Sequence, residues 1–145
     1  MKLKKFSALS LSKGFTLIEL LVVMGIIAIL VAVVAIAVNP GRQFAAARDT
    51  SRQSHVRETL SAVYQYAAQN NGNKPTAITS TPTDIGTNTG LINLETALVP
   101  TYMEALPMDP QNGTRGDTNY TIFLNGNRVT ASATGEINTS ITLTQ

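Results

Sequence analysis

The chain has 145 residues and a formal net charge of +2, and it contains one histidine and no cysteine. The absence of cysteine excludes a disulfide framework and a thiolate metal site, and a single histidine argues against a zinc site or a histidine-activated nucleophile. We therefore expect a small domain plus an anchor, with no enzyme activity, no catalytic residue, no cofactor and no metal.

The N-terminus up to Gly14 forms a basic leader. It holds four of the eleven basic residues, Lys2, Lys4, Lys5 and Lys13. If the chain is cut after Gly14, seven basic residues remain against nine acidic ones, a side-chain charge of about −2. Lysines that precede an apolar span place the N-terminus on the cytoplasmic side. A simple secretory signal does not fit, because the apolar run is too long and follows the small residue.

An apolar stretch follows directly. From Phe15 to Val38 there are 24 residues, and Glu19 is the only charged one. At about 1.5 Å per residue such a helix is roughly 36 Å long, enough to cross a bilayer. A carboxylate costs on the order of 2.5–3.5 kcal/mol at the bilayer centre and less near its edge. This predicts a functional role for Glu19, the alternative being a position at the lipid headgroups.

Asn39-Pro40-Gly41 predicts an interruption, and a second helix is expected over residues 42–70. Its apolar face is predicted to hold Phe44, Val56, Leu60, Val63 and Ala67. Between Arg48 and His55 the helix is polar on every side, which predicts solvent exposure or packing against other subunits. Its four arginines, which include Arg42, Arg52 and Arg57, lie among acidic residues without an aromatic platform. This argues against nucleic-acid binding and favours salt bridges and contacts between subunits.

The rest of the chain predicts loops and a small sheet. Residues 75–116 are expected to form a loop region with a short helix near 91–99, and residues 119–144 a three-stranded antiparallel meander. Asn125-Gly126 and Thr134-Gly135 mark its turns. Three loop aspartates, Asp84, Asp109 and Asp117, are expected to cap turns rather than to bind calcium. The predicted fold class is α+β, with one sheet face covering the amphipathic half of the long helix.

The segment Lys13-Gly14-Phe15-Thr16-Leu17-Ile18-Glu19 and the apolar run after it closely resemble the start of type IV pilins and type II secretion pseudopilins. The resemblance implies a pilin-like fold and a prepilin peptidase that cuts between Gly14 and Phe15 and N-methylates Phe15. It divides the chain into a cleaved leader (1–14), a transmembrane and assembly helix (15–38) and a stalk helix with a globular head (39–145). Glu19 becomes the fifth residue of the mature chain.

The resemblance further implies a structural subunit that polymerises with identical or related subunits on an inner-membrane assembly platform. The precursor would lie in the cytoplasmic membrane and the filament outside the cell or in the periplasm. Glu19 would pair with the amine of Phe15, within one subunit or between two.

Three alternatives remain: a type II secretion pseudopilin, a minor competence pilin that binds DNA, and a membrane-anchored binding or enzymatic domain. The segment 106–110 is similar to the proline–aspartate–proline region of some pseudopilins and simpler pilins. The sequence departs from the family in three ways: it has no proline inside the apolar helix, no pair of cysteines near the C-terminus and no acidic, glycine-rich calcium loop. The last of these favours a pilus over a secretion pseudopilus.

Overall fold

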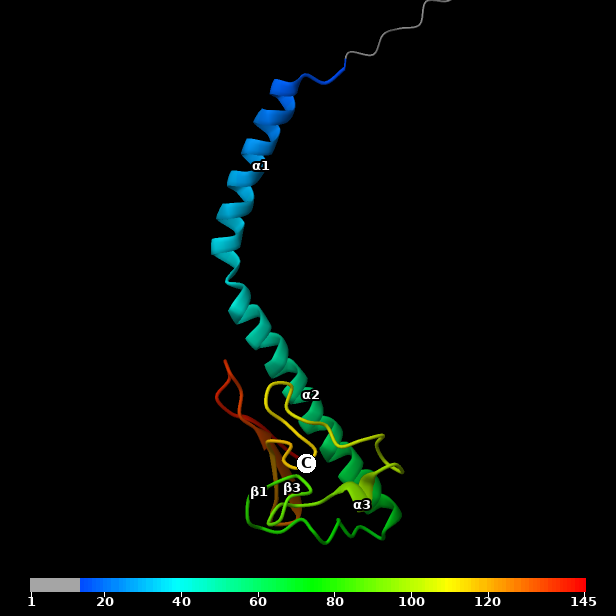
Figure 1. The fold of residues 1–145 in the computed structure, drawn as a ribbon. Helices are drawn as coiled ribbons and strands as arrows, with labels where there is room; N and C mark the ends of the chain where they lie inside the picture. The colour runs from blue at the N-terminus through cyan, green and yellow to red at the C-terminus, as the bar shows by residue number, and fades with distance from the viewer. Residues whose placement is uncertain (1–13) are drawn as a thin grey trace, which may run out of the picture. The chain divides into compact units, whose positions relative to one another are not determined.

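The computed structural model describes residues 14–145, so the predicted basic leader lies, except for Gly14, outside the described residues. The chain forms two compact units, one ending at Asn39 and one spanning Pro40–Gln145. Within residues 14–145 the elements are, in chain order, α1 (Leu17–Val38), α2 (Pro40–Gln69), β1 (Thr83–Asp84), α3 (Glu95–Leu98), β2 (Tyr120–Asn125), β3 (Arg128–Ala133) and β4 (Ile141–Thr144). Figure 1 shows the fold as a ribbon.

The helix α1 makes up most of the first unit. It is a single run of 22 residues, and none of them is buried within the chain. It ends at Asn39, whose backbone adopts the left-handed conformation with φ 43°. Pro40 then occupies the first position of α2, where a proline costs no hydrogen bond because the first amides of a helix lack an intrahelical acceptor. The predicted interruption is confirmed, and it is confined to one residue.

The helix α2 supplies one wall of the core in the second unit. Val56, Leu60 and Val63 are at most 2% exposed and follow the helical repeat. Phe44, however, is 64% exposed, so its predicted place on the core face is wrong. Phe44 lies twelve residues before Val56, and at 3.6 residues per turn this rotates its side chain about 120° away.

The sheet is antiparallel, with strand order β1-β2-β3-β4. Tyr120 and Ile122 on β2 pair with Ala133 and Ala131 on β3, and all four side chains are buried. This alternation is that of a sheet with one covered face, and α2 packs against β3 and β4. The structure confirms the predicted pilin-like α+β class. It adds β1 as a fourth strand, because the backbone of Thr83 and Asp84 pairs with Ile122 and Thr121 in a stretch predicted as loop.

Two details of the meander differ from the prediction. The register pairs Asn125 with Arg128, so the two-residue turn is Gly126-Asn127 rather than Asn125-Gly126. Gly126 has φ 62° and Asn127 has no positive φ, the combination expected of a type II′ turn. The last strand begins at Ile141 rather than directly after the predicted turn at Thr134-Gly135, because backbone amides before Ile141 bind a side chain of α2, as described below.

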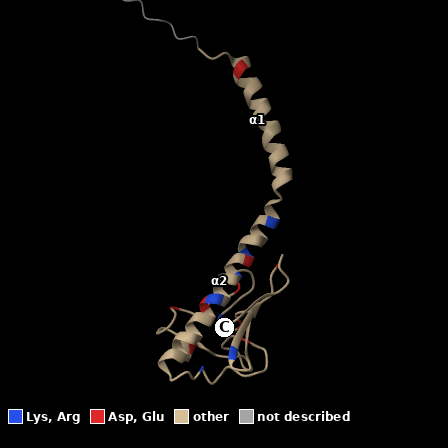
Figure 2. Cartoon of the chain, turned by 180° about the vertical axis from the view of Figure 1, so that it is seen from behind, with Lys and Arg blue, Asp and Glu red and all other residues tan. Residues whose placement is uncertain are grey.

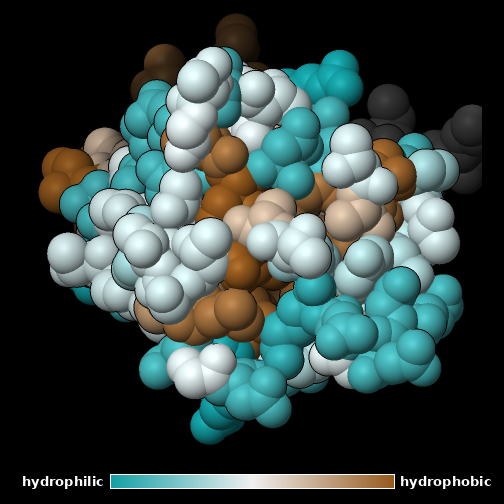
Figure 3. Space-filling view, turned by 90° about the horizontal axis from the view of Figure 1, so that it is seen from below, coloured by the Kyte–Doolittle hydropathy of each residue, from teal (hydrophilic) through white to brown (hydrophobic). Residues whose placement is uncertain are grey.

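The connection between α2 and β2 contributes further apolar residues to the core. Ile85 forms a parallel bridge with Ile92, and Leu94 and Leu98 are fully buried. The short helix predicted near 91–99 is present as the single turn α3, which ends where Val99 becomes extended before Pro100. From below, Figure 3 shows apolar side chains near the centre of this face, with hydrophilic side chains beside them.

Candidate functional site

The start of α1 forms a reciprocal hydrogen-bonded box between Thr16 and Glu19. The hydroxyl of Thr16 accepts a hydrogen bond from the Glu19 amide at 3.2 Å. One carboxylate oxygen of Glu19, Oε2, accepts the Thr16 amide at 2.8 Å and the Thr16 hydroxyl at 2.7 Å. This arrangement is a capping box, in which the side chains at the helix start satisfy amides that have no intrahelical partner.

The capping box pairs Glu19, the one charged residue of α1, with the nearby Thr16. Figure 2 shows a single acidic residue at the start of α1 and no other charge along it. The positive end of the helix dipole lies at the same place and favours a carboxylate there. The cost of Glu19 in an apolar span is therefore offset by Thr16. Our prediction singled out Glu19 and missed Thr16, although Thr16-Leu17-Ile18-Glu19 fits the capping-box pattern.

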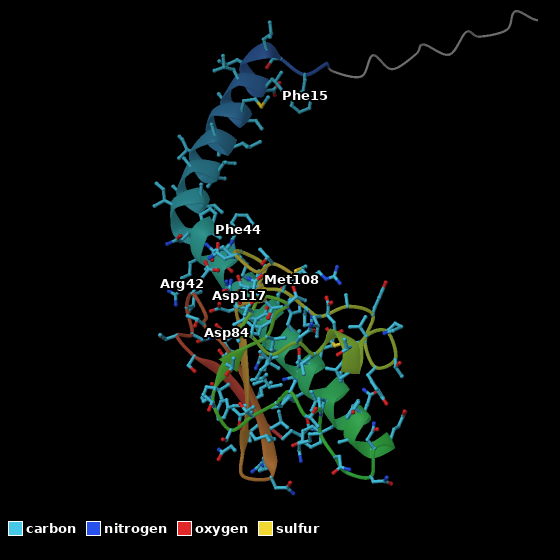
Figure 4. All side chains as sticks on the ribbon, turned by 60° about the horizontal axis from the view of Figure 1, so that its bottom comes forward. Phe15, Arg42, Phe44, Asp84, Met108 and Asp117 are labelled. Atoms are coloured by element: carbon cyan, nitrogen blue, oxygen red, sulfur yellow. The ribbon has the colours of Figure 1, made fainter. Side chains whose placement is uncertain are left out.

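Gly14 and Phe15 lie just before the box, outside any helix or strand. Phe15 is 85% exposed, and Figure 4 shows it at the beginning of α1. A Cβ atom added to Gly14 would meet no atom within 4 Å, so nothing in the described chain requires glycine at this position. The structure places the three predicted site residues on one short segment. It pairs Glu19 with Thr16, and Phe15 is still linked to Gly14 through a peptide bond.

The surface of α1 is apolar on all sides. By length and composition alone, α1 is the one helix within residues 14–145 that could cross a membrane, and none of its apolar residues is buried. A helix that is hydrophobic all round is stable in lipid or in the centre of a helix bundle. The chain itself provides no cover for this surface among the described residues.

A second polar centre lies in the other unit, where α2 meets two loops. Arg52 and Asp49 on α2 are 2% and 4% exposed. The guanidinium of Arg52 donates to Asp109 at 2.5 Å and to Asp49 and Glu136 at 2.9 Å each. Arg48, one turn earlier, binds Glu136 through both carboxylate oxygens, at 2.6 and 2.5 Å. We call these five residues the ion cluster.

Asp49 also holds the backbone of the loop before β4. Its carboxylate oxygens accept the amides of Glu136, Ile137 and Asn138 at 2.8, 2.8 and 3.0 Å. Because these amides are bound to a side chain, they cannot take part in the sheet, which explains the late start of β4. Burial alone would raise the pKa of Asp49, but these three amides and Arg52 together hold it well below the ordinary carboxyl value.

The other carboxylates of the ion cluster are shifted in the same direction. Hydrogen bonds from Arg48 and then Arg52 lower the pKa of Glu136 to about 2. Burial opposes ionisation of Asp109, but Arg52 and the amides of Gln111 and Asn112 outweigh it, so its pKa is also lowered. All three carboxyl groups are therefore ionised at neutral pH. In this state they accept strong, charge-assisted hydrogen bonds from the guanidinium of Arg52.

The ion cluster corrects the prediction for the polar segment from Arg48 to His55. Asp49 and Arg52 are neither exposed to solvent nor available for contacts with other subunits, because they are buried against partners in the same chain. The expected salt bridges are present at Arg48 and Arg52. His55 is half-buried, and its Nδ1 lies 2.8 Å from the hydroxyl of Tyr120.

Two of the three aspartates cap turns, as predicted. Asp109 accepts two amides of its own turn, and Asp117 accepts the Asn119 amide at 3.0 Å. The prediction is wrong for Asp84, which lies on β1 and accepts the hydroxyl of Thr121 on the neighbouring strand at 2.6 Å. Within residues 14–145 no three histidine, aspartate or glutamate side chains are grouped as metal ligands would be.

A long apolar N-terminal helix and a helix-backed antiparallel sheet define a pilin-like α+β protein. Residues 9–35 match the prokaryotic N-terminal methylation motif, so the chain carries the class III signal peptide of type IV pilins and pseudopilins. No curated protein and no solved structure shows a significant match to the chain. The motif marks structural proteins that are processed by prepilin peptidase and assemble into filaments, and α1 fits the membrane anchor of such a precursor.

Proposed function

We propose that this chain is a structural, non-enzymatic subunit of a type IV pilus-like filament. The observation that carries the proposal is the methylation motif at residues 9–35, which overlaps a helix that is apolar and exposed on every side. The precursor is held in the cytoplasmic membrane by α1 with its basic leader inside. After processing, an inner-membrane assembly platform moves the subunit into a filament outside the cell.

Processing on this proposal cuts the peptide bond between Gly14 and Phe15 and methylates the new amine of Phe15. The exposure of both residues supports access by a membrane peptidase. The cut removes four lysines and leaves a mature chain with a negative side-chain charge. It also creates a cationic amine four residues before Glu19.

Assembly on this proposal exchanges lipid for neighbouring helices around α1. One apolar environment replaces another, so the helix is not exposed to water during the transfer. Glu19 is the group that sets the register, because a carboxylate in an apolar bundle is costly unless it is paired. In the precursor Thr16 satisfies Glu19, and in the filament the Phe15 amine of the same or a neighbouring subunit becomes its cationic partner.

Mass spectrometry tests the processing step. Co-expression with a prepilin peptidase is expected to shorten the chain by its leader and to leave N-methylphenylalanine at the new terminus. The matched variant Gly14→Val tests whether cleavage requires glycine, and it is expected to stay uncut. An intact wild-type N-terminus, or a cut near Asn39, would contradict the proposal.

Electron microscopy tests the assembly step. Glu19→Ala is expected to insert and to be processed normally but to form no filaments. Glu58→Gln, which removes an exposed carboxylate from α2, is the matched control and is expected to assemble. Normal filaments from Glu19→Ala would remove the register role of Glu19.

A second candidate is a type II secretion pseudopilin. The segment 106–110, which is similar to a region of some pseudopilins and of simpler pilins, is compatible with both candidates; its Asp109 is 9% exposed and anchors its turn to Arg52. The two candidates differ in where the filament lies. Surface filaments that disappear when the gene is deleted support the pilus, whereas loss of protein secretion without any surface filament supports the pseudopilus.

A further inference from the structure

Phe44 is an exposed aromatic side chain close to the end of the apolar helix. Apart from Phe15 and the residues of α1, the large hydrophobic side chains that are exposed in the described chain are Phe44, Met108 and Ile137, at 64%, 44% and 39%. Figure 4 shows Phe44 on the first turns of α2. The fold of its own subunit does not explain an aromatic ring at this position.

The distance along the chain limits where Phe44 can be. Residues 40–44 are all exposed, and Asp49 is the first buried residue of α2. Phe44 comes six residues after Val38, so the two Cα atoms lie at most about 21 Å apart for any conformation of Asn39. Within α2 itself, Pro40 and Phe44 are separated by only about 6 Å along the helix axis.

The headgroup layer outside the hydrocarbon core of a bilayer is similar in thickness to the axial distance between Pro40 and Phe44. The core is about 30 Å thick and the whole bilayer about 40–45 Å, which leaves roughly 5–8 Å of headgroup region on each side. If α1 spans the core, Phe44 is close enough along the chain to lie in this layer when the first turns of α2 run along the membrane surface. Aromatic rings are stabilised there, because they bury apolar area at the boundary of the acyl chains.

We infer that Phe44 contacts the lipid headgroup region of the membrane that holds the precursor. The inference rests on the membrane anchor proposed for α1. The contact holds the first turns of α2 at the membrane surface and limits how deeply α1 sits. It is lost when the subunit leaves the bilayer, so it belongs to the stored precursor.

Tryptophan fluorescence can test this directly, because the chain contains no tryptophan. The full-length precursor is reconstituted into vesicles of phosphatidylethanolamine and phosphatidylglycerol, with and without bromine on the acyl chains. Three variants carry one tryptophan each. Phe44→Trp probes the contact, Ile27→Trp probes the span, and Gln65→Trp is an exposed control on α2, roughly 31 Å further along the helix.

We expect brominated lipid to quench Ile27→Trp and Phe44→Trp but not Gln65→Trp, with the emission of Phe44→Trp shifted to the blue of the control. Quenching of Ile27→Trp alone would overturn the inference and leave the membrane anchor intact. Failure to quench Ile27→Trp would overturn both. A blue shift at Phe44→Trp without quenching, growing with the protein-to-lipid ratio, would assign Phe44 to a second copy of the chain and overturn the lipid contact.

Discussion

Arg52 on α2 and Asp109, 57 residues later in a loop, form a two-bond fork in which Nε donates to Oδ2 at 2.5 Å and Nη2 to Oδ1 at 3.2 Å. Their side chains are 3% and 7% exposed. An ion pair that is removed from water stabilises a fold only when its remaining donors and acceptors are also satisfied. Here Asp49 and Glu136 accept the other guanidinium hydrogen bonds, so Arg52 joins α2 to two separate loops, one through Asp109 and one through Glu136.

Replacing Arg52 with methionine should strongly destabilise the second unit. The substitution keeps an unbranched side chain but leaves Asp49 and Asp109 buried without their cation. Breaking a buried ion pair from one side costs about 3–5 kcal/mol in free energy of unfolding. Urea unfolding of the full chain in detergent micelles, followed by circular dichroism, measures it. Arg57→Met, an exposed arginine on the same helix, is the control and should change the value by less than about 0.5 kcal/mol. Equal effects of the two variants would contradict a structural role for the ion cluster.

Replacing Asp49 with asparagine should loosen one loop. The asparagine side chain has a single acceptor oxygen, so it cannot hold the amides of Glu136, Ile137 and Asn138 together, and an unpaired buried amide costs about 1–3 kcal/mol. Hydrogen exchange of these three amides should accelerate, while the amide of Ala131 in the centre of the sheet should change less. Glu58→Gln on the solvent side of α2 should leave the pattern unchanged. Uniform acceleration across the sheet would indicate global destabilisation instead.

Acid should destabilise the second unit. The carboxylates Asp49, Asp109 and Glu136 have lowered pKa values in the folded chain, that of Glu136 being about 2. A lowered pKa adds stability above the unfolded value, which lies near 4 for carboxyl groups, and this stability is lost as the pH falls toward the folded value. The free energy of unfolding should therefore vary little between about pH 5 and 8 and decrease from about pH 4 downward. Measuring it as a function of pH tests this, and an increase between pH 4 and 2 would contradict it.

Replacing Thr16 with valine should open the first turn of α1. Valine keeps the shape of threonine but removes the hydroxyl that accepts the Glu19 amide and donates to its carboxylate. Loss of an N-cap costs about 0.5–2 kcal/mol, which corresponds to roughly 2- to 30-fold faster amide exchange. Nuclear magnetic resonance in micelles can follow the amide of Glu19. Thr16→Ser retains the hydroxyl and should exchange like the wild type, so a serine variant as fast as valine would argue against the box.

Local patterns predicted the N-terminal features well. The apolar run predicted α1, Asn39-Pro40 predicted its end, and the motif around Gly14, Phe15 and Glu19 matched the methylation motif. The antiparallel sheet followed from alternation and turn residues, although its turn is shifted by one residue and a fourth strand was missed. The orientation of Phe44 was wrong because a spacing of twelve residues is not a whole number of helical turns.

The sequence by itself determined the features whose partners are close along the chain: the apolar helix, its capping box and its interruption. These features depend on composition and on spacings of a few residues, so local sequence patterns are enough to determine them. The tertiary structure alone decided the role of the polar segment around Arg52, because its partners Asp109 and Glu136 lie 57 and 84 residues away. Burial of charged groups depends on which loops the fold brings over the helix, and helical periodicity carries no information about that.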